Sequence, residues 1–452
     1  MPPLPILTDA ARGRFIMPSR TRHLEIELKA PCVEPEPFGV GVPSYPLPRL
    51  RLTGATDTFK LSVVELENSL LKATFCPALG GRMIAMQGVF SPDLSPVAGG
   101  VRGLWLPHGL QVSLSPELDS MSPMGHMLHE PADDDGPAAL LLHGSTPGSG
   151  LSLQVVYSLL PDSEELLVEA RVFNRTLEHQ RIELTVVHEG GRTRLSPESS
   201  LSPRDTVAFQ ARLSVADGRV ALDFPRFSEH APAVFGELVE ADPASLPINL
   251  RGAAHIRLAN AAALGHDFAS ALEHVDSALA TLADDPLAWW QRAVLARING
   301  EDNDQELTTA HALSPLEPAL RAEAFLAMPQ THSKEPSAVL KGFSPDDFHE
   351  TVHLLIEAGL YQEATRLIDE AQRHQEHPLL RYMHAWCLMQ TTRMEVEASF
   401  EVQKAGKAPF EPPFPWRPLE VRAVRELAER FSKDERLRAL VGLLDKRSGP
   451  AT

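Results

Sequence analysis

The sequence has little that would support a disulfide framework, a nucleic-acid interface or a membrane span. Among 452 residues the only cysteines are Cys32, Cys76 and Cys387, an odd number without the close spacing that disulfide or zinc frameworks need. Lys and Arg number 42 against 60 Asp and Glu, with no basic run suited to a phosphate backbone. Neither a signal-peptide core nor a run of about 18 apolar residues occurs. We therefore expect a cytoplasmic protein with reduced thiols that binds neither nucleic acid nor membrane.

Signatures of common catalytic and cofactor sites are also missing. The chain has no glycine-rich loop ending in Lys-Ser/Thr, no G-x-G-x-x-G after a strand and no G-x-S-x-G elbow. His126 and His129 are three residues apart in a predicted loop, but no third ligand cluster accompanies them. We predict no cofactor and no metal site.

The hydrophobic pattern divides the chain into three parts. Residues 1–50 are rich in proline, which removes ladder donors, so we predict an arm there. Residues 51–240 show short runs with period-2 alternation and are expected to form an antiparallel β-sandwich. From about residue 250 to 448 the period changes to that of amphipathic helices. The fold class is therefore multi-domain β plus α, a β-sandwich followed by a helical solenoid.

The clearest strand signal lies in LSLQVVYSLL, where alternate residues from Leu151 to Leu159 are apolar. The turn PDSEE follows, and LLVEARVFN then places Leu166, Val168, Ala170 and Val172 on one face. These segments predict two adjacent antiparallel strands of one sheet.

The helical part carries a repeat signal typical of tetratricopeptide units. Ala271 and Ala278 are small residues placed where paired helices approach closely. Ala364 and Ala371 recur 34 residues later as Ala398 and Ala405, and 34 residues is the length of this repeat. We expect a stack of helix pairs closed by charged capping helices.

The segment ENSLLKATFCPALGGRMIAM, residues 67–86, resembles the entry strands of galactose mutarotase-like sandwiches. Further matches are Trp105 ahead of a glycine, His126 beyond it, DDDGPAALLL, VYSLLPDSEELLVEARVFNRT and PFPWRPLEVRAVRELAE. Together they resemble the bacterial family named domain of unknown function 5107, in which such a sandwich precedes tetratricopeptide repeats. Gly80 and Gly81 predict a tight bend with φ > 0, from which Arg82 projects.

The resemblance implies a ligand pocket that includes Arg82, Trp105, His108, Gln111 and His126. Family members show a Gly-Gly-Ile-Glu-Phe-Asn-like strand after the tryptophan, whereas this chain has HGLQVSL at residues 108–114. Gln111 stands at the position of the carboxylate and Ser113 at that of the amide. Proton transfer at that strand position is therefore lost.

Mutarotases use a carboxylate and a histidine that face one pocket. Candidates for these roles are His126, His108 and Glu189, although a histidine is more often structural than catalytic. His188 and Glu189 are sequence neighbours on a strand, so their side chains point to opposite faces and do not form a pair. Whether the chain is an enzyme stays open, and an aldose 1-epimerase-like activity is one option.

Three functions remain open from the sequence. The first is a carbohydrate-associated protein whose sandwich binds a sugar while the helical repeats mediate assembly, although aromatic residues make up only 6% of the chain. The second is a non-enzymatic tetratricopeptide scaffold that binds a protein partner or its own copy. The third is a glycoside-processing enzyme, which would need two paired carboxylates from among Glu65, Glu67, Glu117 and Glu189.

Overall fold

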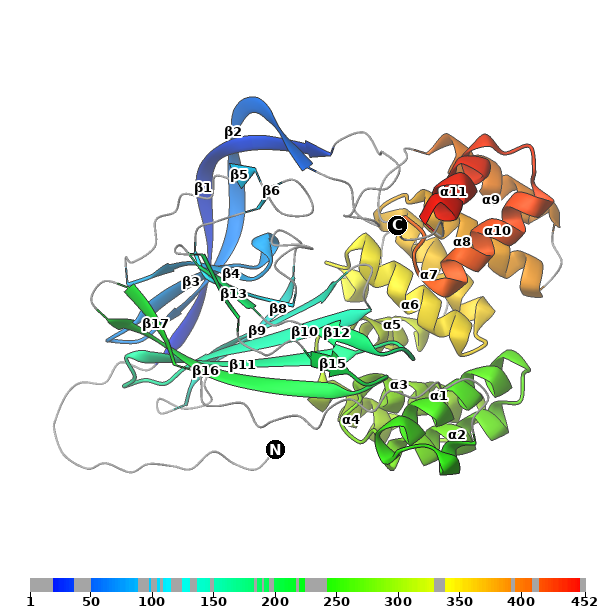
Figure 1. Cartoon of the computed structure of the whole chain (residues 1–452), viewed down its shortest axis with the longest axis horizontal. Helices are drawn as coiled ribbons and strands as arrows, with labels where there is room; N and C mark the ends of the chain where they lie inside the picture. The colour runs from blue at the N-terminus through cyan, green and yellow to red at the C-terminus, as the bar shows by residue number, and fades with distance from the viewer. Residues whose placement is uncertain are drawn as a thin grey trace.

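The structure of the chain is a computed structural model. The residues that the structure describes are 19–35, 50–87, 97–98, 104–105, 109–114, 124–130, 136–146, 150–182, 185–188, 191–194, 199–216, 219–223, 242–328, 338–391, 395–408 and 414–447. The amino-terminal half is built of antiparallel strands and the carboxyl-terminal half of helices, which lie side by side (Figure 1). Among the described residues no α-helix precedes Ile248 and no strand follows Asp223, so the predicted fold class is confirmed.

Two antiparallel sheets dominate the β-region, a four-stranded sheet in the order β1-β2-β3-β4 and a six-stranded sheet in the order β17-β16-β11-β10-β9-β8. Smaller sheets pair β12 with β15, β5 with β6, and β13 with both β14 and β7. The strand bounds are β1 Arg20–Pro35, β2 Leu50–Glu67, β3 Lys72–Cys76, β4 Arg82–Met86, β5 Val97–Ala98, β6 Leu104–Trp105, β7 Gln111–Ser113, β8 Gly125–His129, β9 Ala138–Thr146, β10 Leu151–Leu159, β11 Glu165–Asn174, β12 Gln180–Ile182, β13 Thr185–His188, β14 Gly191–Arg194, β15 Ser199–Leu201, β16 Thr206–Ala216 and β17 Arg219–Asp223.

Strands β10 and β11 form the hairpin that the alternating pattern predicts. Leu159 pairs with Leu166, and the ladder runs in register to Leu151 and Asn174. The alternate apolar residues of both strands face the same side and are buried. They pack against the inner face of the four-stranded sheet, where the rings of Phe75 and Tyr157 lie 4.6 Å apart between centroids. The two sheets therefore enclose one hydrophobic core, as in a sandwich.

Strand β1 departs from the prediction that residues 1–50 form an arm. Residues Arg20–Ala30 contain no proline, and Leu24, Ile26 and Leu28 alternate with charged residues. This segment therefore pairs with β2, with Leu24 opposite Val63, and adds an edge strand to the sheet. The remainder of the predicted arm, residues 1–18 and 36–49, lies outside the described residues.

The helical half stacks its helices largely in antiparallel pairs, with α1 against α2, α3 against α4, α6 against α7, α8 against α9 and α10 against α11. The bounds are α1 Ile248–Leu264, α2 Phe268–Leu279, α3 Pro286–Ile298, α4 Asp304–Leu313, α5 Pro318–Leu326, α6 Pro345–Glu357, α7 Tyr361–His374, α8 Pro378–Thr391, α9 Glu395–Lys407, α10 Pro418–Arg430 and α11 Glu435–Arg447. None of these described helices has the length and apolar character needed to cross a membrane.

The alanines of the predicted repeat lie where helices meet. Ala364 and Ala371 lie on α7, and Ala398 and Ala405 lie on α9, the second helices of successive pairs. All four are buried. The 34-residue offset therefore marks equivalent packing positions in two neighbouring repeats, as the sequence predicts.

Candidate functional site

The bend predicted before Arg82 is present. A short 3-10 turn, Pro77–Leu79, is followed by Gly80 and Gly81 with φ of 68° and 67°, in the left-handed region that glycine adopts readily. A Cβ on Gly81 would lie 2.6 Å from Leu142 Cδ1, on the opposite sheet. The backbone at this bend thus packs tightly into the sandwich and fixes the start of β4.

Arg82 and Gln111, two of the predicted pocket residues, are in direct contact. Arg82 Nη2 donates to Gln111 Oε1 at 2.7 Å, and Gln111 Nε2 donates to the carbonyl oxygen of Gly80 at 2.9 Å. Both side chains are buried, at 0% and 3% exposure. Burial lowers the pKa of the Arg82 guanidinium to about 10, an effect that nearby Tyr157 partly opposes, so Arg82 is still a cation at neutral pH. This polar pair lies inside the fold.

The packing around this pair is close. Gly109 has a φ of 77°, and a Cβ there would lie 2.5 Å from the carbonyl oxygen of Met83 and 3.3 Å from Cγ of Arg82. Met83 and Leu110 exchange two backbone hydrogen bonds of 2.8 and 2.9 Å. The substituted segment after Trp105 is therefore bound to β4 at its glycine rather than held open above it.

His126 lies in a different setting, on β8 at the edge of the six-stranded sheet. Its half-buried ring is 5.6 Å from the ring of His23 on β1. Burial, and then the neighbouring His23, lower the pKa of His126, so its neutral form is favoured at pH 7. His129 is on the same strand, whereas the sequence predicts a loop for both histidines. Among the described residues no group of three or more potential ligands could hold a metal ion.

Of the remaining predicted site residues, the structure describes only the main chain of two. The main chain of Trp105 pairs with Val97 as part of β6, and the main chain of His188 ends β13 opposite Gly191. His108, Glu117 and Glu189 lie outside the described residues.

Two of the carboxylates considered for glycoside chemistry form ion pairs on β2. Glu65 accepts from Lys72 Nζ at 2.7 Å, and Glu67 lies 3.5 Å from Arg20 Nε. These contacts are structural ion pairs between neighbouring strands of one sheet.

A second polar constellation, which the sequence did not indicate, joins the β-region to the helices. Arg175 follows β11 directly, and its guanidinium lies between Glu317 and Glu350, with Nη1 2.5 Å from Glu350 Oε1. Arg204 precedes β16, and its Nε donates to Asp285 Oδ2 at 2.8 Å. Burial opposes the charge on Arg175, but Glu317 and Glu350 outweigh it and raise the pKa of this arginine.

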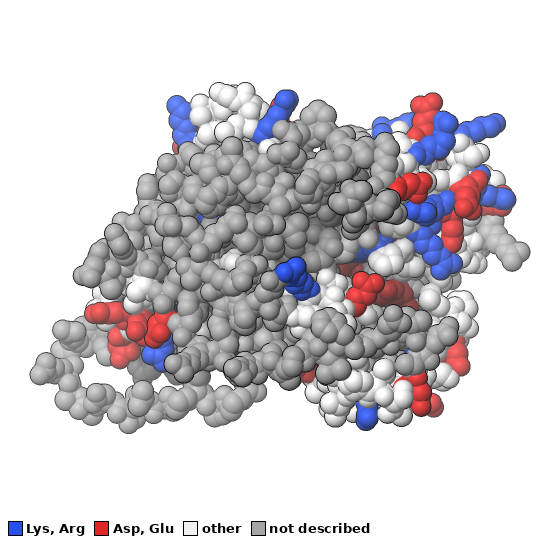
Figure 2. Space-filling view, in the orientation of Figure 1, with Lys and Arg blue, Asp and Glu red and all other residues white. Residues whose placement is uncertain are grey.

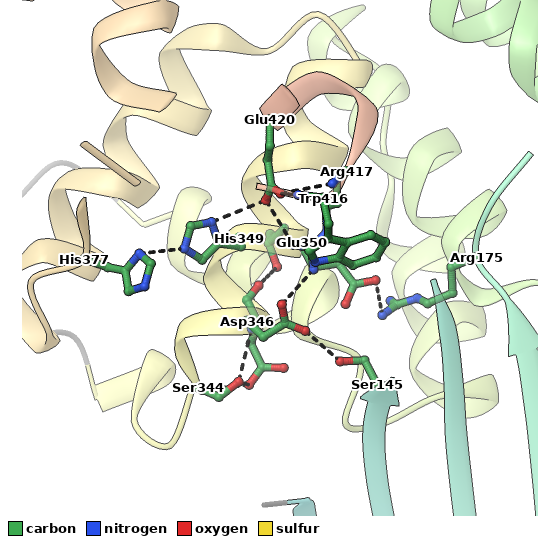
Figure 3. A network of polar contacts seen from close by, with 12 residues as sticks. Ser145, Arg175, Ser344, Asp346, His349, Glu350, His377, Trp416, Arg417 and Glu420 are labelled. Carbon is green, nitrogen blue, oxygen red and sulfur yellow. Dashed lines mark hydrogen bonds and ion pairs between the residues drawn. The ribbon is translucent and has the colours of Figure 1, made fainter. Parts of the chain in front are cut away.

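Figure 3 shows how the network continues into the helical half. Ser145 of β9 donates to Asp346 at 3.0 Å, and Arg417 donates to the other oxygen of Asp346 at 3.0 Å. Arg417 also donates to Glu420 at 3.0 Å, and His349 Nδ1 lies 3.4 Å from the same carboxylate. Burial opposes ionisation of Glu420, but Arg417 and His349 hold its pKa far below the usual range. A largely buried polar network thus connects β9, α6 and α10.

Several helices that contribute to this network begin with a polar residue before a proline. Asp285, Glu317, Ser344 and Arg417 each precede a proline that occupies the first turn of a helix, α3, α5, α6 and α10 respectively. Proline is favoured at that position because the missing N–H has no partner in a helix. The pattern of a polar residue before proline is readable in the sequence, but the partners of these residues are not.

The contact region between Arg175, Arg204 and the helices contains a small pocket. Its lining includes Ser152, Asn174, Thr206, Asp285 and Glu317, and it has space for about one water molecule. The pocket is far below the size of a sugar site. We therefore regard the constellation as a contact between two parts of the chain.

Comparisons with known proteins give distant likenesses. No protein-family model matches the chain, and no curated protein matches it. A tetratricopeptide (TPR)-domain containing protein from Parabacteroides distasonis ATCC 8503 is 12% identical, with a TM-score of 0.37, over 87% of this chain and 96% of that one. The TPR domain of P58(IPK) is 17% identical, with a TM-score of 0.17, over 41% and 62% of the two chains. MamA (41-end) from Desulfovibrio magneticus RS-1 is 11% identical, with a TM-score of 0.18, over 44% and 97%. At these TM-scores the likenesses carry no argument about function.

Proposed function

We propose that the chain is a non-enzymatic scaffold in which the helical repeats bind a protein partner and the β-region is a companion domain that packs against them. The observation that favours this proposal over a sugar site is the direct contact between Arg82 and Gln111, both buried inside the fold. A sugar site needs polar groups that face a concave, accessible surface. Here Arg82 donates to Gln111, and Gln111 donates to the backbone of Gly80, so the two predicted ligand groups contact the protein itself.

The contact between the two halves of the chain supports the same proposal. Arg175 and Arg204 reach from the β-region to carboxylates on α3, α5 and α6. Asn249 of α1 adds a hydrogen bond of 3.1 Å to Ser202, and Leu177 packs against the cores of α1 and α2. These contacts join the helices to the sheet in the structure of the chain.

Calorimetric titration tests whether the protein binds carbohydrates, and an anomer-exchange assay tests whether it acts on them. The protein is titrated with a panel of mono- and oligosaccharides, and anomer interconversion of glucose and galactose is followed by exchange spectroscopy. The scaffold proposal expects flat heats and no acceleration over buffer. Saturable heat that is lost in Arg82→Lys or Gln111→Ala variants of unchanged thermal stability would overturn it.

Carbohydrate binding is the second candidate function, because the family resemblance places Arg82 and Gln111 in one site and they do contact one another. In that case His126 and Trp105 would complete the site, and the helical repeats would mediate assembly or self-association. An aldose 1-epimerase-like reaction would also need His108 or Glu189 as a proton-transfer group. We also propose that the chain divides into domains at 51–240 and 250–448. The assignment of the first domain to a galactose mutarotase-like family is likewise a proposal.

We also propose a cytoplasmic location, because Cys32, Cys76 and Cys387 are all free thiols. Reporter fusions or fractionation of the native host would test it. Recovery of the protein from an oxidising compartment would contradict it.

A further inference from the structure

The helical half presents a row of carboxylates to the β-region. Asp285 caps α3, Glu317 precedes α5, and Glu350 lies in the second turn of α6. All three are buried, although free carboxylates at helix ends would ordinarily be hydrated. Their burial is explained by the cations that they hold.

Two arginines from the β-region occupy this row. Arg175 is enclosed by Glu317 and Glu350, and Arg204 pairs with Asp285 at 2.8 Å. The two arginines are adjacent, because Arg204 Nη1 donates to the carbonyl oxygen of Arg175 at 3.4 Å. A planar guanidinium with several donors suits a site walled by two carboxylates better than the point charge of a lysine. The row thus has the chemistry of an arginine-binding surface.

Buried polar groups on β9, on β10 and on Arg204 itself lack hydrogen-bond partners among the described residues. Neither ring nitrogen of buried His143 has a hydrogen-bond partner among the described residues, and the same holds for Gln154 Oε1 on the neighbouring strand and for Nη2 of Arg204. His143 and Gln154 are directly opposite each other in the β9–β10 ladder. Buried polar groups without partners cost free energy that hydration would restore. The contact is therefore polar and not fully hydrogen-bonded at Arg204, and polar interfaces between parts of one chain generally permit relative motion.

We infer that the carboxylate row Asp285, Glu317 and Glu350 is a docking surface for an arginine-bearing protein segment, which the β-region occupies within the same chain. A partner that presents arginines displaces Arg175 and Arg204 and takes their place. This inference rests on the proposed function, in which the helical repeats are an interaction module, and it adds the chemistry of the partner and an autoinhibitory contact.

Exposed charges elsewhere on the helices provide the matched control. Over the helices seen in Figure 2, basic and acidic side chains are interspersed. The pairs Arg430–Glu395 and Arg425–Asp445 are solvent-exposed examples. Because the chain carries a net charge of -18, any basic peptide will bind weakly, and the control must separate this background from the row.

The test measures binding of a fluorescein-labelled peptide with three arginines in Gly-Ser spacers, and of its lysine counterpart, to the full chain by anisotropy. The inference expects Arg175→Ala/Arg204→Ala to bind the arginine peptide at least tenfold tighter than wild type. Adding Glu317→Gln/Glu350→Gln should abolish that gain, whereas adding Glu395→Gln/Asp445→Gln should leave it. No gain in the first variant, a gain that survives loss of Glu317 and Glu350, or equal gains for lysine would overturn it.

Hydrogen exchange of the wild-type chain keeps the inference testable if the arginine variant does not fold. Saturating arginine peptide should raise amide exchange at the end of β11 and the start of β16, near residues 171–176 and 202–208, at least several-fold. Unchanged exchange there would contradict displacement. Binding of a sugar by the sandwich would overturn the scaffold proposal without changing the peptide-binding or hydrogen-exchange result. Failure of the scaffold proposal can therefore be distinguished from failure of the docking inference.

Discussion

Arg204 Nε lies 2.8 Å from Asp285 Oδ2, and this ion pair connects the loop before β16 to the N-cap residue of α3. The other oxygen of Asp285 caps α3 by accepting from the N–H of Leu287 at 2.9 Å. One carboxylate therefore begins a helix and holds the β-region at the same time. Arg204 adopts a φ of 61°, unusual for a residue other than glycine, to reach it.

Removal of Arg204 should destabilise the whole chain. Arg204→Ala leaves Asp285 buried without its cation, and we expect a loss of about 3 kcal/mol in the free energy of unfolding measured with urea. In a double-mutant cycle with Asp285→Ala, the coupling energy should exceed about 1 kcal/mol. A loss below about 0.5 kcal/mol would show that the contact does not hold the two halves together.

Gly109→Ala should be costly because its Cβ would lie 2.5 Å from the carbonyl oxygen of Met83, in addition to the strain of a φ of 77°. We expect a loss of about 2–4 kcal/mol. Gly300→Ala is the matched control, with a φ of 79° but nothing within 4 Å, and should cost about 1 kcal/mol. Equal losses in thermal or urea unfolding would contradict the close packing of Gly109 beneath Arg82.

Ala371→Leu tests the packing of the helical repeats. Ala371 is buried between paired helices, and added methyl groups should cost about 1–3 kcal/mol through overpacking. Ala261→Leu, at an exposed position of α1, should change stability by less than about 0.5 kcal/mol. If both substitutions are tolerated alike, the small residues of the repeat do not set the helix separation.

His143 should make stability fall toward acid pH. Burial, and then Arg175, lower the pKa of His143 to about 3, below its ordinary value of 6.5. The unfolded chain thus binds a proton below pH 6.5 that the folded chain refuses, so stability is present above pH 6.5 and is lost as pH falls toward 3. Between pH 6.5 and 5 the loss is about 2 kcal/mol. His143→Leu should remove that part of the pH dependence in urea titrations, and an unchanged slope would contradict the buried neutral ring.

Local sequence patterns predict much of the fold, because the residues that form these elements and hairpins lie close together in the sequence. Alternation from Leu151 to Leu159 and from Leu166 onward sufficed for the β10–β11 hairpin, and the 34-residue offset of Ala364 and Ala398 located buried helix contacts. The prediction of an arm for residues 1–50 is wrong where β1 forms. It gave the surrounding prolines more weight than the apolar–charged alternation within Arg20–Ala30. Pairing with β2 makes that segment a strand.

The network between the two halves was not predictable from the sequence for a physical reason. Arg175 and Glu317 are 142 positions apart, and Arg204 and Asp285 are 81 apart. Neither pair follows a helix or strand periodicity, so only the completed fold brings them together. By contrast, Arg82 and Gln111 were placed in one site by the family resemblance, and they are in contact.

If the contacts of Arg175 and Arg204 couple the sheet to the helices, the full chain unfolds as one unit, which differential scanning calorimetry measures. We expect one cooperative transition for the wild type, with equal calorimetric and van't Hoff enthalpies, and two separate transitions for Arg175→Ala/Arg204→Ala. Two separate transitions already in the wild-type chain would contradict it.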